Sequence, residues 1–195
     1  MEIKIMSLVP PFEMGVWNAW ILSLTFLFVQ FGSLVIFNRI NKGAFKRAAA
    51  PQPAEKIDRF VVLLTIAAFI YSIFLPLELG SVWFYVGVPI YSLGLIILII
   101  ASTNFATTLL DEPVTKGLYR YSRNPMYLGM FLVFIGISIA SASWVFLLIS
   151  IAFITLINIE VVYEERFCLK KYGDAYREYM KRASRWLGLP ESGER

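Results

Sequence analysis

The chain has 195 residues, of which 58% are apolar and 16% charged, and its mean hydropathy is +0.66. Soluble domains are about 45–50% apolar and about 25% charged, so this composition argues against a water-soluble globule. The sequence contains no histidine, which removes the commonest general base and metal ligand. We therefore expect no metal site and no Ser-His-Asp triad.

Five long apolar segments dominate the chain, and a bilayer core needs about 20 apolar residues per helix. Only Ser141 and Ala142 separate the last two segments, which predicts a tight helical hairpin. We predict an all-α integral membrane protein with five transmembrane helices and a C-terminal cytoplasmic amphipathic helix. The five predicted spans are 17–37, 60–79, 81–102, 125–140 and 143–159.

The basic residues predict the topology, because Lys and Arg mark cytoplasmic loops. They gather between the first and second segments, between the third and fourth, and after the fifth, whereas only Lys4 precedes the first. We therefore expect a multi-pass protein with its N-terminus outside and its C-terminus in the cytoplasm. The net charge of +4 then follows from topology and from attraction to anionic headgroups, so the bilayer is the expected partner and nucleic acid is not.

Residues 115–129 lead into the fourth segment and carry several polar side chains. Pro125 suits the first turn of a helix, and Asn124 before it can act as its N-cap. Pro125 and Ile159 lie equally far in sequence from the turn near Ala142, about 25 Å at 1.5 Å per residue. The entrance of the fourth helix should therefore lie beside the end of the fifth.

Two acids near the end of the fifth segment are the predicted catalytic residues. Glu160 and Glu164 are spaced i, i+4 and share one helix face, whereas Glu165 should point elsewhere. Tyr127 and Asn124 should lie beside this face. Carboxylates at the inner edge of a membrane are candidates for function, and the alternative is a structural charge cluster.

The sequence after the fifth segment indicates a second, shorter helix. Gly173 is typical of a helix end and Asp174 of the next N-cap. We expect an amphipathic helix on the cytoplasmic surface, with a cover over a cofactor as the alternative. Its apolar stripe comprises Tyr172, Tyr176, Tyr179, Met180 and Ala183, opposite Arg177, Lys181, Arg182 and Arg185.

Two sequence blocks carry a family resemblance. The first, 117–129, contains Arg-Asn-Pro-Met-Tyr-Leu-Gly, and the second, 164–190, contains Glu-Glu-Arg-Phe-Cys-Leu-Lys-Lys-Tyr-Gly-Asp-Ala-Tyr. Together they resemble the isoprenylcysteine carboxyl methyltransferase and phospholipid methyltransferase superfamily, whose pattern is R-H-P-x-Y-x-G, a hairpin, and an E-E block with a G-x-x-Y-x-x-Y tail. We accordingly divide the chain into a three-span membrane region, 1–110, and a catalytic region, 111–195.

The resemblance implies an S-adenosylmethionine-dependent methyltransferase that acts on a lipid-like or isoprenoid acceptor at the cytoplasmic face. It also implies that Glu164 is the site acid and faces the reacting centre. The cofactor-binding residues carried over by position are Glu112, Pro113, Val114, Tyr119, Asn124, Pro125, Met126 and Tyr127.

The chain departs from the family pattern at two positions. Asn124 replaces the family histidine and cannot transfer a proton near neutral pH. Glu160 stands where prenylcysteine enzymes carry an arginine, and a glutamate repels a substrate carboxylate that an arginine would bind. The acceptor can be a carboxylate, which needs no base, or an amine, whose proton Glu160 or Glu164 would accept.

Two other functions remain open. The C-terminal region of sterol-reductase-type membrane enzymes resembles the same R-H-x-x-Y-x-G pattern and binds NADPH, although the present chain has no glycine-rich dinucleotide motif. The other alternative is a non-catalytic membrane scaffold in which the polar blocks only stabilise the hairpin. Binding measurements with both cofactors separate the three readings.

Overall fold

The computed structural model describes residues 13–109 and 111–188, apart from 41–53. All regular elements in this part of the chain are helices, so the predicted all-α class is confirmed. They are α1 (Trp20–Ile40), α3 (Ala54–Ile73), α4 (Val82–Ala106), the 3-10 helix η1 (Gly117–Arg120), α5 (Pro125–Ala140), α6 (Trp144–Tyr172) and α7 (Asp174–Arg182).

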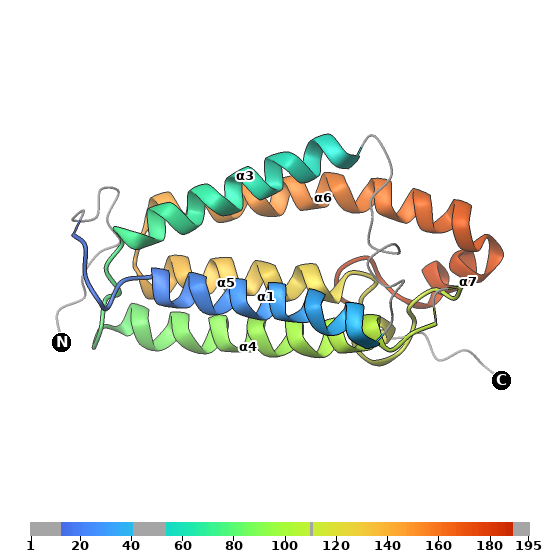
Figure 1. The fold of residues 1–195 in the computed structure, drawn as a ribbon, viewed down its shortest axis with the longest axis horizontal. Helices are drawn as coiled ribbons and strands as arrows, with labels where there is room; N and C mark the ends of the chain where they lie inside the picture. Colours follow the sequence, from blue (N-terminus) through green and yellow to red (C-terminus); the bar gives the residue numbers. More distant parts are fainter. Residues whose placement is uncertain (1–12, 41–53, 110, 189–195) are drawn as a thin grey trace.

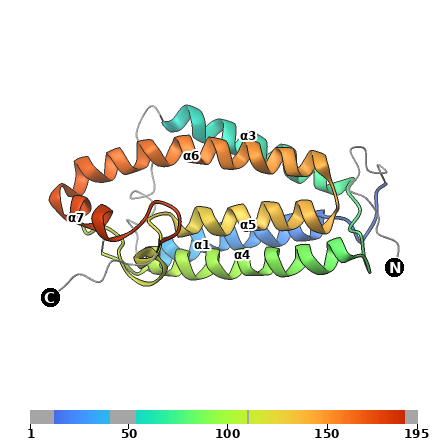
Figure 2. The ribbon, with the colours of Figure 1, turned by 180° about the vertical axis from the view of Figure 1, so that it is seen from behind.

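The long helices are arranged in two layers (Figures 1 and 2). One layer contains α3 and α6 side by side, and the other contains α1, α4 and α5. Aromatic side chains fill the space between the layers: Phe134 of α5 stacks on Phe153 of α6 with ring centroids 4.2 Å apart, and Phe131 meets the same ring edge-on. The core therefore lies between the layers.

The backbones of α4 and α5 approach each other through glycines. A Cβ atom added to Gly94 would lie 2.7 Å from the carbonyl oxygen of Gly129, and one added to Gly136 would lie 2.5 Å from the backbone nitrogen of Tyr91. Such spacings leave no room for a side chain. Glycine thus lets two membrane helices touch along their length, the arrangement that small residues permit in bilayers.

The observed helix boundaries differ from the predicted spans, and a proline accounts for the difference at the end of α3. The second span was expected to continue to residue 79, but α3 ends at Ile73, since the residue before a proline disfavours helical backbone and Pro76 lacks an N–H. Asn18 then donates its side-chain N–H to the Ile73 carbonyl over 2.8 Å, which satisfies a carbonyl at the end of α3.

Two described helices, α4 and α6, are long and apolar enough to cross a bilayer. Residues 20–33 of α1 and the whole of α5 form shorter apolar helices. With 29 residues, α6 is about 43 Å long, more than the hydrocarbon core of about 30 Å requires. A helix of this length cannot fit entirely within such a core.

Three residues, 141–143, connect α5 to α6. Ala142 has a φ of 47°, and Ser143 caps α6 by accepting the Phe146 N–H over 3.2 Å. This connection and the α3–α4 connection lie at one end of the bundle, while residues 107–124 and α7 lie at the other (Figure 1). Every candidate site residue lies at this second end.

We predict that Gly129→Ala and Gly136→Ala each lower the free energy of unfolding in detergent by about 1–3 kcal/mol, since overpacking would push α4 and α5 apart. Gly32→Ala is the matched control, because a Cβ atom there meets nothing within 4 Å. The measurement is reversible denaturation of each purified variant. Equal losses at all three positions would contradict the proposed role of the helix contact.

Candidate functional site

The start of α5 is tied to the C-terminal part of the chain. Asn124 occupies the N-cap position and Pro125 the first turn, as predicted, but the Asn124 side chain makes no capping bond. It donates instead to the carbonyl of Arg185 over 3.1 Å, while the Ser122 hydroxyl accepts the Asn124 backbone N–H over 3.0 Å. That Asn124 lies beside Glu160 and Glu164 stays a prediction.

Tyr127 and Glu164 meet across α5 and α6. The Tyr127 hydroxyl donates to Glu164 Oε1 over 3.0 Å. Tyr127 lies in the first turn of α5 and Glu164 in the C-terminal part of α6, so the hydrogen bond joins the start of one helix of the hairpin to the later turns of the other. The contact joins a predicted cofactor-wall residue to the predicted site acid.

Glu160 lies one helical turn before Glu164 and is 5% exposed. Its Oε2 atom has no hydrogen-bond partner among the described residues. Burying a carboxylate without a partner is costly, and natural proteins keep such groups where a ligand or a reaction uses them. The buried Glu160 and the half-buried Glu164 therefore form an acidic face with one oxygen available to a cationic or hydrogen-bonding group.

Glu165 points away from these acids, as expected, but it is not a free surface group. It is 4% exposed and accepts from Arg123 Nε over 2.9 Å and from Arg185 Nη2 over 2.7 Å. The hydrogen bond to Glu165 raises the pKa of the Arg185 guanidinium, which keeps the guanidinium charged. No local sequence pattern indicated this cluster beyond the Glu-Glu pair itself.

The predicted cofactor loop splits into a buried and an exposed part. Val114 and Tyr119 are buried in a second apolar cluster at this end of the bundle, and Met126 packs against it. Pro113 is half-buried, and Glu112 is exposed. The structure thus brings Val114, Tyr119 and Met126 together, and it leaves Glu112 outside the cluster.

The apolar stripe of α7 packs against this same cluster. Tyr176, Tyr179 and Ala183 are buried there, and the Tyr179 hydroxyl donates to the Tyr119 carbonyl over 2.7 Å. Burial raises the pKa of the Tyr179 phenol, so it remains a donor. The expected placement of this stripe on the membrane surface is therefore wrong, because protein side chains already cover it.

The boundary between α6 and α7 also needs a small correction. Gly173, with a φ of 56°, ends α6 as predicted. The N-cap of α7 is Gly173 itself, and Asp174 is the first helical residue. The basic residues of α7 remain exposed, and two of them pair with acids on the same helix: Arg177 with Asp174 and Lys181 with Glu178.

Two further contacts fix the loops at this end. Asn104 of α4 accepts the Leu118 backbone N–H through Oδ1 over 3.1 Å, and it packs directly on Gly117, whose φ is 60°. Trp186 donates to Asn158 Oδ1 over 3.1 Å and contacts the ring of Phe131. These partners are distant in sequence, so no local pattern indicated them.

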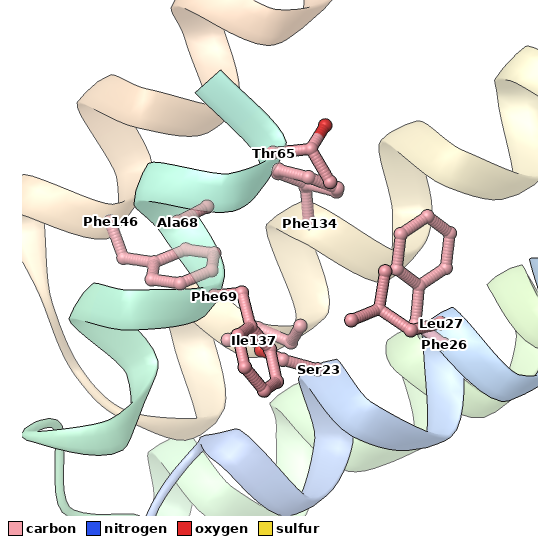
Figure 3. A pocket seen from close by; sticks show the side chains of 9 residues that line it. All are labelled: Ser23, Phe26, Leu27, Thr65, Ala68, Phe69, Phe134, Ile137 and Phe146. Carbon is pink, nitrogen blue, oxygen red and sulfur yellow. The ribbon is translucent and has the colours of Figure 1, made fainter. Parts of the chain in front are cut away.

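A small apolar hollow lies deeper in the bundle (Figure 3). Its free volume is about 10 Å³, room for about one water molecule, so it holds no ligand chain as it stands. It is lined by Ser23, Phe26, Leu27, Thr65, Ala68, Phe69, Phe134, Ile137 and Phe146.

The comparisons with known proteins give one family. The family model of phospholipid methyltransferases matches residues 102–175, which run from the end of α4 through α5 and α6 into α7. No curated protein matches the chain. The matched region contains the Tyr127–Glu164 contact, the Glu160 carboxylate and most of the predicted cofactor loop. Residues 102–175 therefore match the phospholipid methyltransferase family, which belongs to the superfamily that the two sequence blocks resemble.

Proposed function

We propose that the protein transfers a methyl group from S-adenosylmethionine to an amine carried by a lipid-like acceptor at the cytoplasmic face of the membrane. The observation that carries this proposal is the acidic face of α6, where Glu164 accepts from Tyr127 and the buried Glu160 keeps an unpartnered oxygen. The phospholipid methyltransferase domain supplies the reaction type.

The residues at this end suit a cationic, aromatic cofactor. S-adenosylmethionine, when bound, supplies an activated methyl group on a positively charged sulfur. The cluster of Val114, Tyr119 and Met126 offers apolar and aromatic surface for an adenine ring. The acids of α6 favour positive charge nearby. The residues that would hold the cofactor are Glu112, Pro113, Val114, Tyr119, Asn124, Pro125, Met126 and Tyr127.

Two acids on one face favour an amine acceptor over a carboxylate. Glu160 and Glu164 would repel an anionic nucleophile and attract an ammonium group. An ammonium group must lose a proton before it can attack, and a carboxylate within reach can accept that proton. We assign this role to Glu164, whose orientation Tyr127 fixes, and the binding of the acceptor's positive charge to Glu160.

The contribution of the chain to rate is then mainly geometric. Methyl transfer is an in-line displacement, so holding nucleophile, methyl group and leaving sulfur collinear supplies much of the acceleration. The Tyr127–Glu164 contact joins the wall of the cofactor site to the acid beside the acceptor. A lipid chain would lie among the apolar helices while the charged cofactor arrives from the cytosol.

We further propose that α1, α3, α4, α5 and α6 all cross the membrane, with the α5–α6 hairpin last, and that the site faces the cytoplasm. The basic residues in the described part of the chain lie at the same end as the acidic face, which agrees with the positive-inside rule. We expect a cysteine at Ala175, which is exposed at that end, to react only with cytoplasmic thiol reagents. A cysteine at Leu79, exposed at the opposite end, should react only from outside.

These two positions are labelled in a Cys168→Ser background, because Cys168 is the sole native cysteine. Intact and inverted vesicles provide access to each face in turn. Labelling of both positions from one side would exclude this topology.

We predict that Tyr127→Ala and Pro125→Ala weaken S-adenosylmethionine binding about tenfold, or about 1.4 kcal/mol, because both residues shape the start of α5. Isothermal titration calorimetry in detergent measures the affinity for S-adenosylmethionine. A separate titration with NADPH tests the reductase alternative. Tyr85→Ala is the control, since Tyr85 is exposed on α4 and far from this end. Binding of NADPH but not S-adenosylmethionine would replace the proposed function with a reductase.

We predict that Glu164→Gln lowers turnover roughly 10²- to 10⁴-fold, because the amide keeps the shape of the side chain but cannot accept a proton. Affinity for the cofactor should change much less. Transfer of radiolabelled methyl groups into amine lipids provides the assay. Glu178→Gln is the matched control, since Glu178 is exposed on α7 and pairs only with the nearby Lys181 among described residues. Comparable losses in the two variants would remove Glu164 from the reaction.

A further inference from the structure

One buried carboxylate joins two arginines that are far apart in sequence. Glu165 uses Oε1 for Arg123 Nε, over 2.9 Å, and Oε2 for Nε and Nη2 of Arg185, over 3.1 and 2.7 Å. Both oxygens are therefore occupied. Because the carboxylate is only 4% exposed, water screens these bonds little, and the three side chains form one compact charged cluster.

The cluster also fixes the segment that follows α7. Arg123 donates through Nη1 to the carbonyls of Met180 and Ala183, over 3.1 and 2.6 Å, and its backbone N–H bonds to the Ser184 carbonyl over 2.8 Å. Residues 183–188, here called the C-terminal strap, are thus held against the start of α5. Three elements meet at Glu165: α6, the start of α5, and the end of α7 with its strap.

The position of this cluster relates it to the proposed site. Glu165 follows Glu164 directly on α6, and Arg123 lies one helical turn before Tyr127. The bond between Glu165 and Arg123 therefore sets the register of α6 relative to α5 near the Tyr127–Glu164 contact. The connecting turn at residues 141–143 lies at the other end of the hairpin, about 20 Å away along α5 and about 30 Å away along α6, and restrains this register less directly.

We propose that Glu165 is a positioning residue for the methyl transfer: by holding Arg123 and Arg185 it fixes α6 against the start of α5 and thereby sets the Tyr127–Glu164 contact. This inference rests on the proposed function. Glu165 touches neither reacting group and acts through its neighbour. Its removal should therefore lower kcat and leave the Michaelis constant for the acceptor nearly unchanged.

The first test is a double-mutant cycle on kcat. Glu165→Gln should lower kcat about 10²-fold, the loss expected for a misplacement of about 1 Å. In a Tyr127→Phe background, Glu165→Gln should lower kcat less than about threefold. The Tyr127–Glu164 hydrogen bond, which Glu165 is proposed to set, is already absent from that background. Equal losses in both backgrounds would overturn the proposal and leave Glu165 as a structural charge.

Arg185→Gln gives a second, milder variant, because the Arg185 side chain is 41% exposed and its loss leaves the Arg123 bond in place. It should lower kcat by about tenfold, in the same cycle and with the same dependence on Tyr127. Lys181→Gln is the matched control, since it breaks an exposed ion pair with Glu178 on α7 and should change kcat less than twofold. A loss with Lys181→Gln as large as that with Arg185→Gln would contradict the proposal.

A spectroscopic readout separates this inference from the proposed function. A 3-fluorotyrosine at position 127 reports its hydrogen bond through the fluorine-19 chemical shift, whether or not the protein transfers methyl groups. Glu164→Gln calibrates the shift, and Glu165→Gln should move the signal in the same direction while Lys181→Gln leaves it in place. An unmoved signal in the Glu165 variant would refute the positioning role. If the wild-type protein transfers no methyl group but the variants show the expected fluorine-19 shifts, only the proposed function is refuted.

Discussion

The close contact between α4 and α5 is the constraint on which the arrangement of this end of the bundle depends. Because glycines bring the two backbones together, the end of α4 lies beside the start of α5, and the loop between them must fold tightly. Asn104 of α4 binds the Leu118 N–H in that loop and leaves Gly117 no room for a Cβ atom. The glycine contact between α4 and α5 thus determines where the loop between them can lie.

Three acids on the last turns of α6 have three different environments, and the differences are informative. Glu165 is bound by two arginines, Glu164 by one phenol, and Glu160 keeps an unpartnered oxygen. Ion pairing compensates the cost of burying Glu165. No hydrogen-bond partner among the described residues compensates the cost of burying Oε2 of Glu160. A protein under selection for stability alone has no reason to retain Glu160 there. The uncompensated acid is therefore the strongest pointer to a ligand.

Much of the fold could be predicted from local pattern, and the rest depended on distant partners. Apolar runs located the helices, and the equal distances of Pro125 and Ile159 from one turn predicted that Tyr127 lies beside the acids of α6. The same reasoning showed only that Glu165 points elsewhere, since its partners lie 42 and 20 residues away. It also misplaced the apolar stripe of α7, because an amphipathic helix looks alike in sequence whether it covers lipid or protein. Proline and backbone geometry, not hydropathy, decided where α3 ends.

Asn124 stands where the family pattern has a histidine, and its contacts indicate which residues carry the proposed proton transfer. Asn124 donates its side-chain N–H to the Arg185 carbonyl, so it binds the C-terminal strap and takes no part in proton transfer. In the proposed reaction an amine acceptor must still lose a proton, and we assign its acceptance to a carboxylate of α6. Binding of the strap and acceptance of the proton therefore fall to different helices. The Glu165 cluster is the connection that keeps those two helices in register.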